Sequence, residues 1–366
     1  MRNTCLYSVA VSFAVLLGGC YHPKIADVSF RCGPGGLCPE GYVCNALMLC
    51  AQVGGTGGVD LSGVDAGPLF SGRIGKIDLT GSTGVLTCST KTGEMKLNDV
   101  AGTVIVAASS DGFSVVNQGS GPQVAIWSFS YFFVPAGLTL KPGPGTDALP
   151  VFASSGELKI NGAIDWRGFG GFGNLPGMDG AGKMSGAASG GGAGVNDGGG
   201  GGGGYADVGG TGLASTGGAG GVAYGAPNLM PLHAGSGGGG GGAAGGNGGN
   251  GGGGIALIAA GSLTVAGKLD ASGVAGFDAN SSGGGGGGGG SGGSILLSGA
   301  MVTLASGHEL AARGGNGGKG TGTGGAGGVG AAGRIWIGGQ FSVEGTVVSD
   351  PMPTTEAMQL TSFPAQ

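Results

Sequence analysis

Short runs of alternating apolar and polar residues fill the chain between residues 74 and 116. Apolar side chains, many of them β-branched, recur at every second position, and glycine, serine, threonine or asparagine separates one run from the next. No stretch shows the 3.6-residue period of an amphipathic helix. The pattern therefore predicts an all-β region of short strands. The runs are 76–79, 84–87, 94–97, 103–106 and 113–116.

The longest alternating run, residues 124–134, is rich in aromatic side chains. A single straight strand would carry four of them on one side: Trp127, Phe129, Tyr131 and Phe133. Such a row can form a platform on which a sugar stacks, so these four are candidate ligand contacts. Aromatic strand faces more often pack inward, and we favour a buried core for this run.

Beyond residue 150 the sequence repeats itself with a period of about 40 residues. Residues 255–273 match 295–314, a third copy begins at Ile335, and an earlier copy at 158–168 lacks a clean first strand. Each copy holds three short strands joined by glycine or small-residue corners. One such unit cannot bury its apolar face alone, whereas stacked copies form a continuous core. The expected fold class is all-β, a parallel β-solenoid with long glycine-rich insertions.

The insertions are 168–254, 274–293 and 313–333, and glycine dominates all three. They have almost no side chains to bury. We expect mobile or loosely packed loops. The alternative is close packing of polyglycine II rods, which the absence of side chains permits and which have no internal hydrogen bonds.

Composition sharpens this picture. Of 366 residues, 99 are glycine and only 10% are charged, with a net charge of −5, whereas an ordinary globular chain has about 25% charged residues. The glycine blocks lack the strict third-residue period of collagen. Long charge runs are also missing, which argues against a charged disordered tail and against nucleic acid as a partner.

The N-terminus predicts export. A lone Arg2 precedes an apolar run that ends at Leu17, too short to span a bilayer, which takes about 20 residues. Leu17-Gly-Gly-Cys20 matches the bacterial lipobox, so residues 1–19 are a predicted lipoprotein signal peptide and Cys20 the predicted lipid-attachment site. The alternative is an ordinary secretory peptide that leaves Cys20 a plain thiol. Because Tyr21 stands where aspartate would favour inner-membrane retention, we expect an outer-membrane anchor, facing the periplasm or the cell surface.

Four evenly spaced cysteines follow, Cys32, Cys38, Cys44 and Cys50, with turn residues between them. Residues 20–50 are too few for a hydrophobic core, which predicts a small module held by two disulfides with three possible pairings. Zinc would require Cys-x-x-Cys pairs or further histidines near His22. Cys88 has no evident partner, and we expect it to be a buried free thiol.

Two stretches carry a family resemblance. The pattern Phe-x-Cys…Cys-Pro-x-Gly-x-x-Cys…Cys resembles the short cysteine module that follows the lipid anchor in many surface lipoproteins of gliding, predatory soil bacteria. Residues 120–345 resemble glycine-rich exported proteins of the same bacteria, which contain blocks of the type Gly-Gly-x-Ile-x-Leu. The resemblance implies a surface-displayed, adhesin-like solenoid and brings no catalytic residues with it.

Candidate chemistry is sparse. Gly-x-Gly-x-x-Gly matches arise by chance in so glycine-rich a chain, and the phosphate-loop match at 177–184 fails because Met184 replaces the required Ser or Thr. The aspartates of the glycine-rich region lack the period of a calcium-binding array, and no Ser/His/Asp set can be assembled around His233 or His308. We therefore expect no metal and no cofactor. The aspartates concerned are Asp179, Asp197, Asp207 and Asp278.

Asp165 and Asp270 follow matching apolar residues in two copies of the repeat and are expected on one outward face. Paired carboxylates are the groups that glycosidases use. Ala311 stands at the matching place in the next copy and interrupts the row. Solvated turn carboxylates are the reading we favour.

These observations divide the chain into successive parts. They are the signal peptide (1–19), the anchor and cysteine module (20–50), a flexible linker (51–71), the β-rich N-terminal part of the solenoid (72–152), the glycine-rich repeats (153–348) and a C-terminal tail (349–366). We expect a membrane-anchored lipoprotein without enzymatic activity that has a structural, adhesive or matrix-binding role. Its expected partners are membrane lipid, through Cys20, and polysaccharide or other cell-envelope components. The alternative is a carbohydrate-active β-helix enzyme, a polysaccharide lyase or glycosidase.

Overall fold

The computed structural model describes the chain in separate stretches. They are 28–31, 42–44, 49–52 and 355–357, as backbone alone, and 70–98, 102–118, 121–144, 146–169, 190–346 and 348–354. No helix occurs in these stretches, and so none that is long and apolar enough to cross a membrane. For this part of the chain, the prediction of an all-β protein is confirmed.

A small antiparallel sheet lies in the predicted cysteine module. It consists of β1 (Val28–Arg31), β3 (Leu49–Gln52) and β2 (Tyr42–Cys44), in that order. Cys44 and Cys50 are directly opposite in the backbone register of β2 and β3. Cys20, Cys32 and Cys38 lie outside the described residues. Of Cys44 and Cys50 only the backbone is described.

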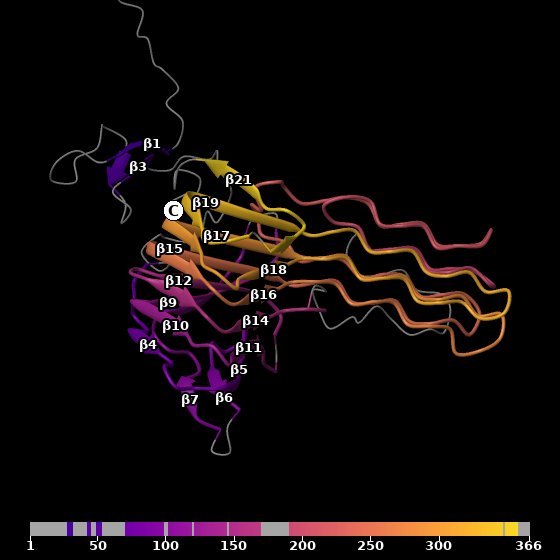
Figure 1. Ribbon diagram of the computed structural model, residues 1–366, viewed down its shortest axis with the longest axis horizontal. Helices are drawn as coiled ribbons and strands as arrows, with labels where there is room; N and C mark the ends of the chain where they lie inside the picture. The colour runs from indigo at the N-terminus through magenta and orange to yellow at the C-terminus, as the bar shows by residue number, and fades with distance from the viewer. Residues whose placement is uncertain are drawn as a thin grey trace, which may run out of the picture.

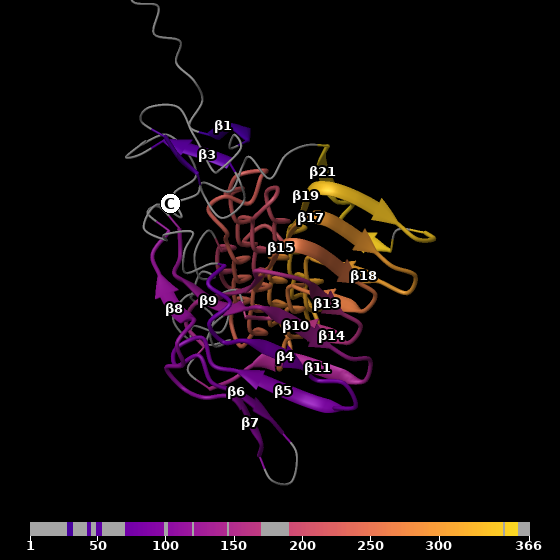
Figure 2. The ribbon, with the colours of Figure 1, turned by 90° about the vertical axis from the view of Figure 1, so that its left-hand side faces the viewer.

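The remaining strands form two large sheets, and within each sheet the strands lie side by side along the molecule (Figures 1 and 2). The first sheet contains β4 (Lys76–Asp78), β8 (Phe113–Val116), β9 (Val124–Phe129), β10 (Tyr131–Val134), β12 (Leu149–Ser154), β13 (Leu158–Ile160), β15 (Gly254–Val265), β17 (Ser294–Leu304), β19 (Arg334–Val343) and β21 (Thr354–Ala357). The second contains β5 (Gly84–Cys88), β6 (Met95–Leu97), β7 (Val104–Val106), β11 (Leu138–Pro142), β14 (Ala163–Asp165), β16 (Lys268–Asp270), β18 (Glu309–Ala311) and β20 (Ser349–Asp350).

Both sheets are mixed. The copies of the repeat lie side by side as parallel strands, with Ile255 opposite Ile295 and Ile295 opposite Ile335. The copy at 158–168 lacks a clean first strand in the sequence, and β12 takes the place of that strand by pairing with β15. At the N-terminal end the pairing becomes antiparallel, between β5, β6 and β7 in one sheet and between β8 and β9 in the other.

The main core lies between the two sheets. Every second residue of the paired strands points into it, so the same position is buried in successive copies, as with Leu263 and Val302 or with Leu269 and Leu310. Its N-terminal part is a stack of aromatic rings, in which Trp127 and Phe152 have centroids 5.2 Å apart. Cys88 is a buried free thiol in this core, as predicted, and burial raises its pKa.

The aromatic run does not form a single face. Residue 130 separates β9 from β10, and the alternation changes phase at this corner. Trp127 and Phe129 therefore point into the core together with Phe132, whereas Tyr131 and Phe133 are only half-buried. The expectation of four aromatics on one side of a straight strand is wrong.

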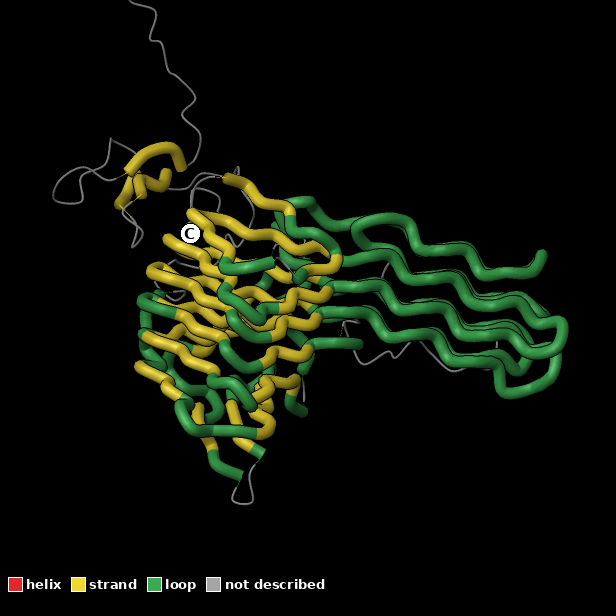
Figure 3. The backbone as a smooth tube through the Cα atoms, in the orientation of Figure 1, coloured by secondary structure: helices red, strands yellow, loops and turns green. Residues whose placement is uncertain are grey.

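The glycine-rich insertions project from the corners between β14 and β15, β16 and β17, and β18 and β19 (Figure 3). They run out and back as long extended segments, packed side by side and joined by hydrogen bonds. The expectation of mobile or loosely packed loops is therefore wrong for residues 190–253, 273–293 and 313–333.

Candidate functional site

We call each extended segment of the insertions a glycine rod and the assembly the glycine bundle. Along residues 285–293 the backbone amides donate to three neighbouring rods in strict rotation. Residues 285, 288 and 291 donate to the carbonyls of Gly242, Gly239 and Ser236, residues 286, 289 and 292 to Gly325, Gly328 and Ala331, and residues 287, 290 and 293 to Phe277, Val274 and Ala271. A three-residue period without hydrogen bonds inside the rod is that of the polyproline II helix.

Two rods lie at the centre of the bundle, and each is hydrogen-bonded to six others. Rod 198–204 is surrounded by 190–195, 209–213, 216–221, 237–242, 285–289 and 325–331. Rod 284–293 is surrounded by 198–204, 236–242, 246–252, 271–277, 312–318 and 325–331. The bundle is thus a hexagonal array in which buried backbone groups bond between rods, some close in sequence and others far apart.

This packing requires glycine at the contacts between rods. A Cβ atom added at Gly201 would collide with the backbone of Ala219, and one added at Gly288 with the backbone of Gly201. Both lie well inside the 3.0 Å that real Cβ atoms keep from other atoms. Glycine is needed here for close approach rather than for flexibility.

The outer rods carry side chains on the positions that face solvent. Arg313, Asn316 and Lys319 form one such row, separated by pairs of glycines. Three residues of a polyproline II helix rise about 9.3 Å, so each row repeats at that spacing. The sequence signal of the rods is the motif Gly-Gly-x, in 244–252 and 313–319.

Polar and aromatic contacts dock the bundle against the first sheet. The Tyr205 hydroxyl lies 2.5 Å from Ser294 Oγ, which donates to the His233 carbonyl, and the Arg334 guanidinium lies over the Tyr205 ring. Burial raises the pKa of Tyr205 to about 12. A second apolar cluster, which includes Leu229 and Trp336, fills the space beneath.

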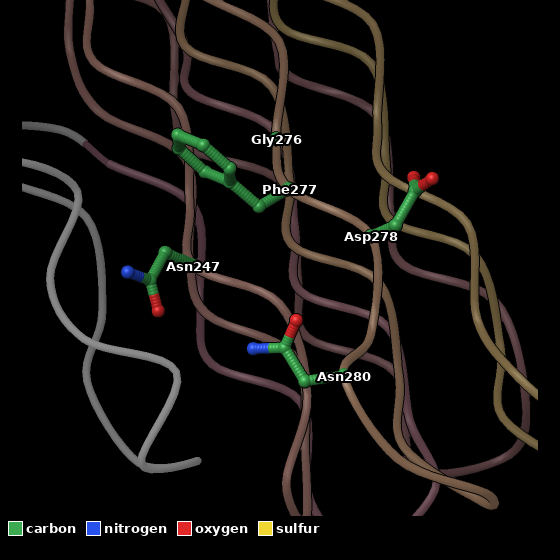
Figure 4. Close-up of a pocket in the computed structure, with 5 residues that line it drawn as sticks. All are labelled: Asn247, Gly276, Phe277, Asp278 and Asn280. Carbon is green, nitrogen blue, oxygen red and sulfur yellow. The ribbon is translucent and has the colours of Figure 1, made fainter.

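A shallow pocket opens on the side of the bundle, with a volume of about 490 Å³. It is lined by Asn247, Gly276, Phe277, Asp278 and Asn280 (Figure 4). Phe277 and Asn247 lie on one side of the rod, whereas the Asp278 carboxylate points to the other side and accepts a hydrogen bond from the Lys319 amide. The pocket thus combines an aromatic ring with two side-chain amides.

Asp165 and Asp270, singled out in the sequence, are brought together. They are directly opposite in the register of β14 and β16. Arg167 bridges them, 2.8 Å from Asp165 and 3.5 Å from Asp270. Partial burial alone would raise the pKa of Asp165, but hydrogen bonds from Arg167 and the charges of Arg167 and Lys141 outweigh it and hold that pKa below its ordinary value.

The charges continue beyond this pair across the second sheet. Lys268 links Asp270 to Glu309, and Arg313 links Glu309 to Asp350. Ala311 does interrupt the row of aspartates, as the sequence indicated, but the ion pairs bypass it. We call this alternating chain the charge ladder; its members are Lys141, Asp165, Arg167, Asp270, Lys268, Glu309, Arg313 and Asp350.

Lysines on neighbouring strands cover the candidate ligand-contact aromatics that face outward. Lys76 Nζ lies 4.8 Å from the centroid of the Tyr131 ring, and Lys159 Nζ lies 5.8 Å from that of Phe133. Trp127 and Phe129 are fully buried. A sugar that stacked on Tyr131 or Phe133 would have to share the ring with a lysine.

In the part of the chain that the structure describes, no three His, Cys, Asp or Glu side chains gather closely enough to hold a metal ion. No family model, no curated protein and no solved structure matches the chain.

Proposed function

We propose that this protein is an exported lipoprotein, anchored in the outer membrane through acylated Cys20, that has a structural, adhesive or matrix-binding role at the cell surface. In this proposal residues 72–348 form a parallel β-solenoid from whose side the glycine bundle projects. Supporting it are the lipobox sequence, the in-register parallel copies and the resemblance to glycine-rich surface lipoproteins.

The glycine bundle is the observation that carries the proposal. It is an extension in which neighbouring rods satisfy the buried backbone amides of the central rods. Its outward rows of side chains form the surface that we propose meets a partner. A rigid arm with a patterned surface suits attachment better than catalysis.

Two experiments test the proposal. Purified mature protein is incubated with cell-envelope, matrix and polysaccharide fractions, with heat-denatured protein as control. We expect saturable binding to at least one fraction, and binding no greater than that of the control would refute the adhesive role.

Metabolic labelling with a fatty-acid analogue tests the anchor. Label should be incorporated and lost in Cys20→Ser, and label retained in that variant would exclude Cys20 as the site.

A carbohydrate-active enzyme is the second candidate, favoured by the facing carboxylates of Asp165 and Asp270. A glycosidase needs one carboxyl group that is protonated at working pH, whereas Arg167 stabilises the ionised form of Asp165. This geometry suits a structural role better. Release of reducing ends or unsaturated sugars from a polysaccharide panel, abolished in Asp270→Asn, would establish the enzyme instead.

A further inference from the structure

Two rows of outward side chains run beside each other on the bundle. Asn247 and Asn250 belong to rod 246–252, and Val274 and Phe277 to rod 271–277. The amide of Val274 donates to the Asn250 carbonyl and that of Phe277 to the Asn247 carbonyl, both at 2.8 Å. The backbone thus holds each apolar side chain next to an asparagine, at intervals of about 9.3 Å along the rods.

The Phe277 ring is 60% exposed, although glycine is the commonest residue around it. No aromatic pair among the described residues includes it. The hydrogen bonds between rods are made by backbone groups and do not require the ring. Beside it the surface is hollowed into the pocket of about 490 Å³, a volume within the range of small-ligand sites.

We propose that this pocket binds a sugar unit of a neutral glycan. A pyranose ring has an apolar face, which would pack on Phe277, and a rim of hydroxyl groups. The side-chain amide of Asn280 offers donors and an acceptor to such hydroxyls, and Asn247 lines the same pocket. Unlike Tyr131 and Phe133, Phe277 has no lysine over its ring in the part of the chain that the structure describes.

The charges of the lining favour a neutral ligand over an acidic one. Among the described residues no lysine or arginine lines the pocket, so these residues offer no counter-charge to a carboxylate or sulfate group. The one charged group, Asp278, is turned toward Lys319 and would repel an acidic sugar.

This inference rests on the proposed adhesive function and names its ligand, and titration calorimetry of the full mature chain tests it. The probes are soluble gluco-, manno- and galacto-oligosaccharides, with oligogalacturonate as the acidic comparison. We expect at least one neutral oligosaccharide to bind. Phe277→Ala and Asn247→Ala should each weaken that binding by about tenfold or more. Val222→Ala, at an equally exposed valine of another rod, is the matched control and should leave it unchanged.

The possible outcomes separate the two proposals. No binding of any neutral oligosaccharide, binding of the acidic one alone, or full affinity in Phe277→Ala would overturn the pocket assignment. If envelope or matrix fractions still bind wild type and Phe277→Ala equally, the adhesive function stands without this site. Amide hydrogen exchange in the rods shows whether each variant retains the bundle. If Phe277→Ala loses the bundle, the affinity of Asn247→Ala for the same oligosaccharides decides whether the pocket is the binding site.

Discussion

Gly288→Ala tests the packing of the glycine bundle at its centre. Gly288 lies in one central rod and faces the backbone of Gly201 in the other. The new Cβ would be so far inside the ordinary contact distance of 3.4 Å that the rods must separate by more than about 1 Å. Both rods are enclosed by neighbours on all sides, so neither can move aside freely.

The separation breaks hydrogen bonds that can be named. The bonds from Gly200 to Gly286 and from Gly203 to Gly289, both 2.9 Å long, directly join the two rods, and lengthening them by 1 Å removes them. Two buried donors left without partners destabilise by about 1–3 kcal/mol each. Alanine also lowers the conformational entropy of the unfolded chain, which offsets about 0.4–1 kcal/mol of this loss of stability. The net expectation is that the free energy of unfolding of the bundle falls by roughly 1–6 kcal/mol.

Hydrogen exchange read by mass spectrometry measures this loss locally. In Gly288→Ala the amides of 198–204 and 284–293 should lose protection by one or more orders of magnitude, while those of β15 and β17 retain theirs. Ala219→Ser, which enlarges an exposed side chain of a neighbouring rod, is the control and should match wild type. If the two variants had the same protection, glycine would not be required for contact and the packing argument would fail.

Three further outcomes are expected. Arg167→Ala should lower the free energy of unfolding, measured by urea denaturation, by about 1 kcal/mol at pH 7. The pKa of Asp165 is lowered in the folded state, so that stabilisation exists above the unfolded value of about 3.9 and is lost as pH falls through the folded value. The difference between variant and wild type should therefore be smaller at pH 3 than at pH 7. An equal difference at both pH values would contradict this. Tyr205→Phe should destabilise by about 1 kcal/mol through loss of the bond to Ser294, measured by thermal unfolding. Because burial raises the pKa of Tyr205 to about 12, wild-type stability should also fall between pH 10 and 12, and less steeply in Tyr205→Phe; identical alkaline profiles would argue against a buried Tyr205.

The strands and their stacking partners could be predicted because they depend on local alternation. The repeats at 255, 295 and 335 were visible in the sequence, and the parallel pairs follow them. The phase change at residue 130 could not be seen, because a serine without a neighbouring glycine or proline does not mark a corner. A single corner was enough to move Tyr131 and Phe133 to the opposite side from Trp127.

The candidate sites show a similar division. The juxtaposition of Asp165 and Asp270 followed from their matching places in two copies. Arg167 and Lys268 were missed as members of the charge ladder because long side chains reach across strands, and reach is not encoded in spacing. The order of the bundle was missed because its bonds join rods distant in sequence, such as those of Gly200 and Gly286.

The bundle also has a thermal consequence. Its interior is peptide backbone with almost no apolar side chain, whereas the core between the sheets is made of leucine, isoleucine, valine and aromatic rings. Exposure of apolar surface raises the heat capacity on unfolding, and exposure of polar surface lowers it. On cooling, hydrophobic stabilisation of the core between the sheets therefore weakens. The rods depend little on hydrophobic stabilisation and are less affected. Near the freezing point the projecting arm should keep its rigidity better than the core between the sheets.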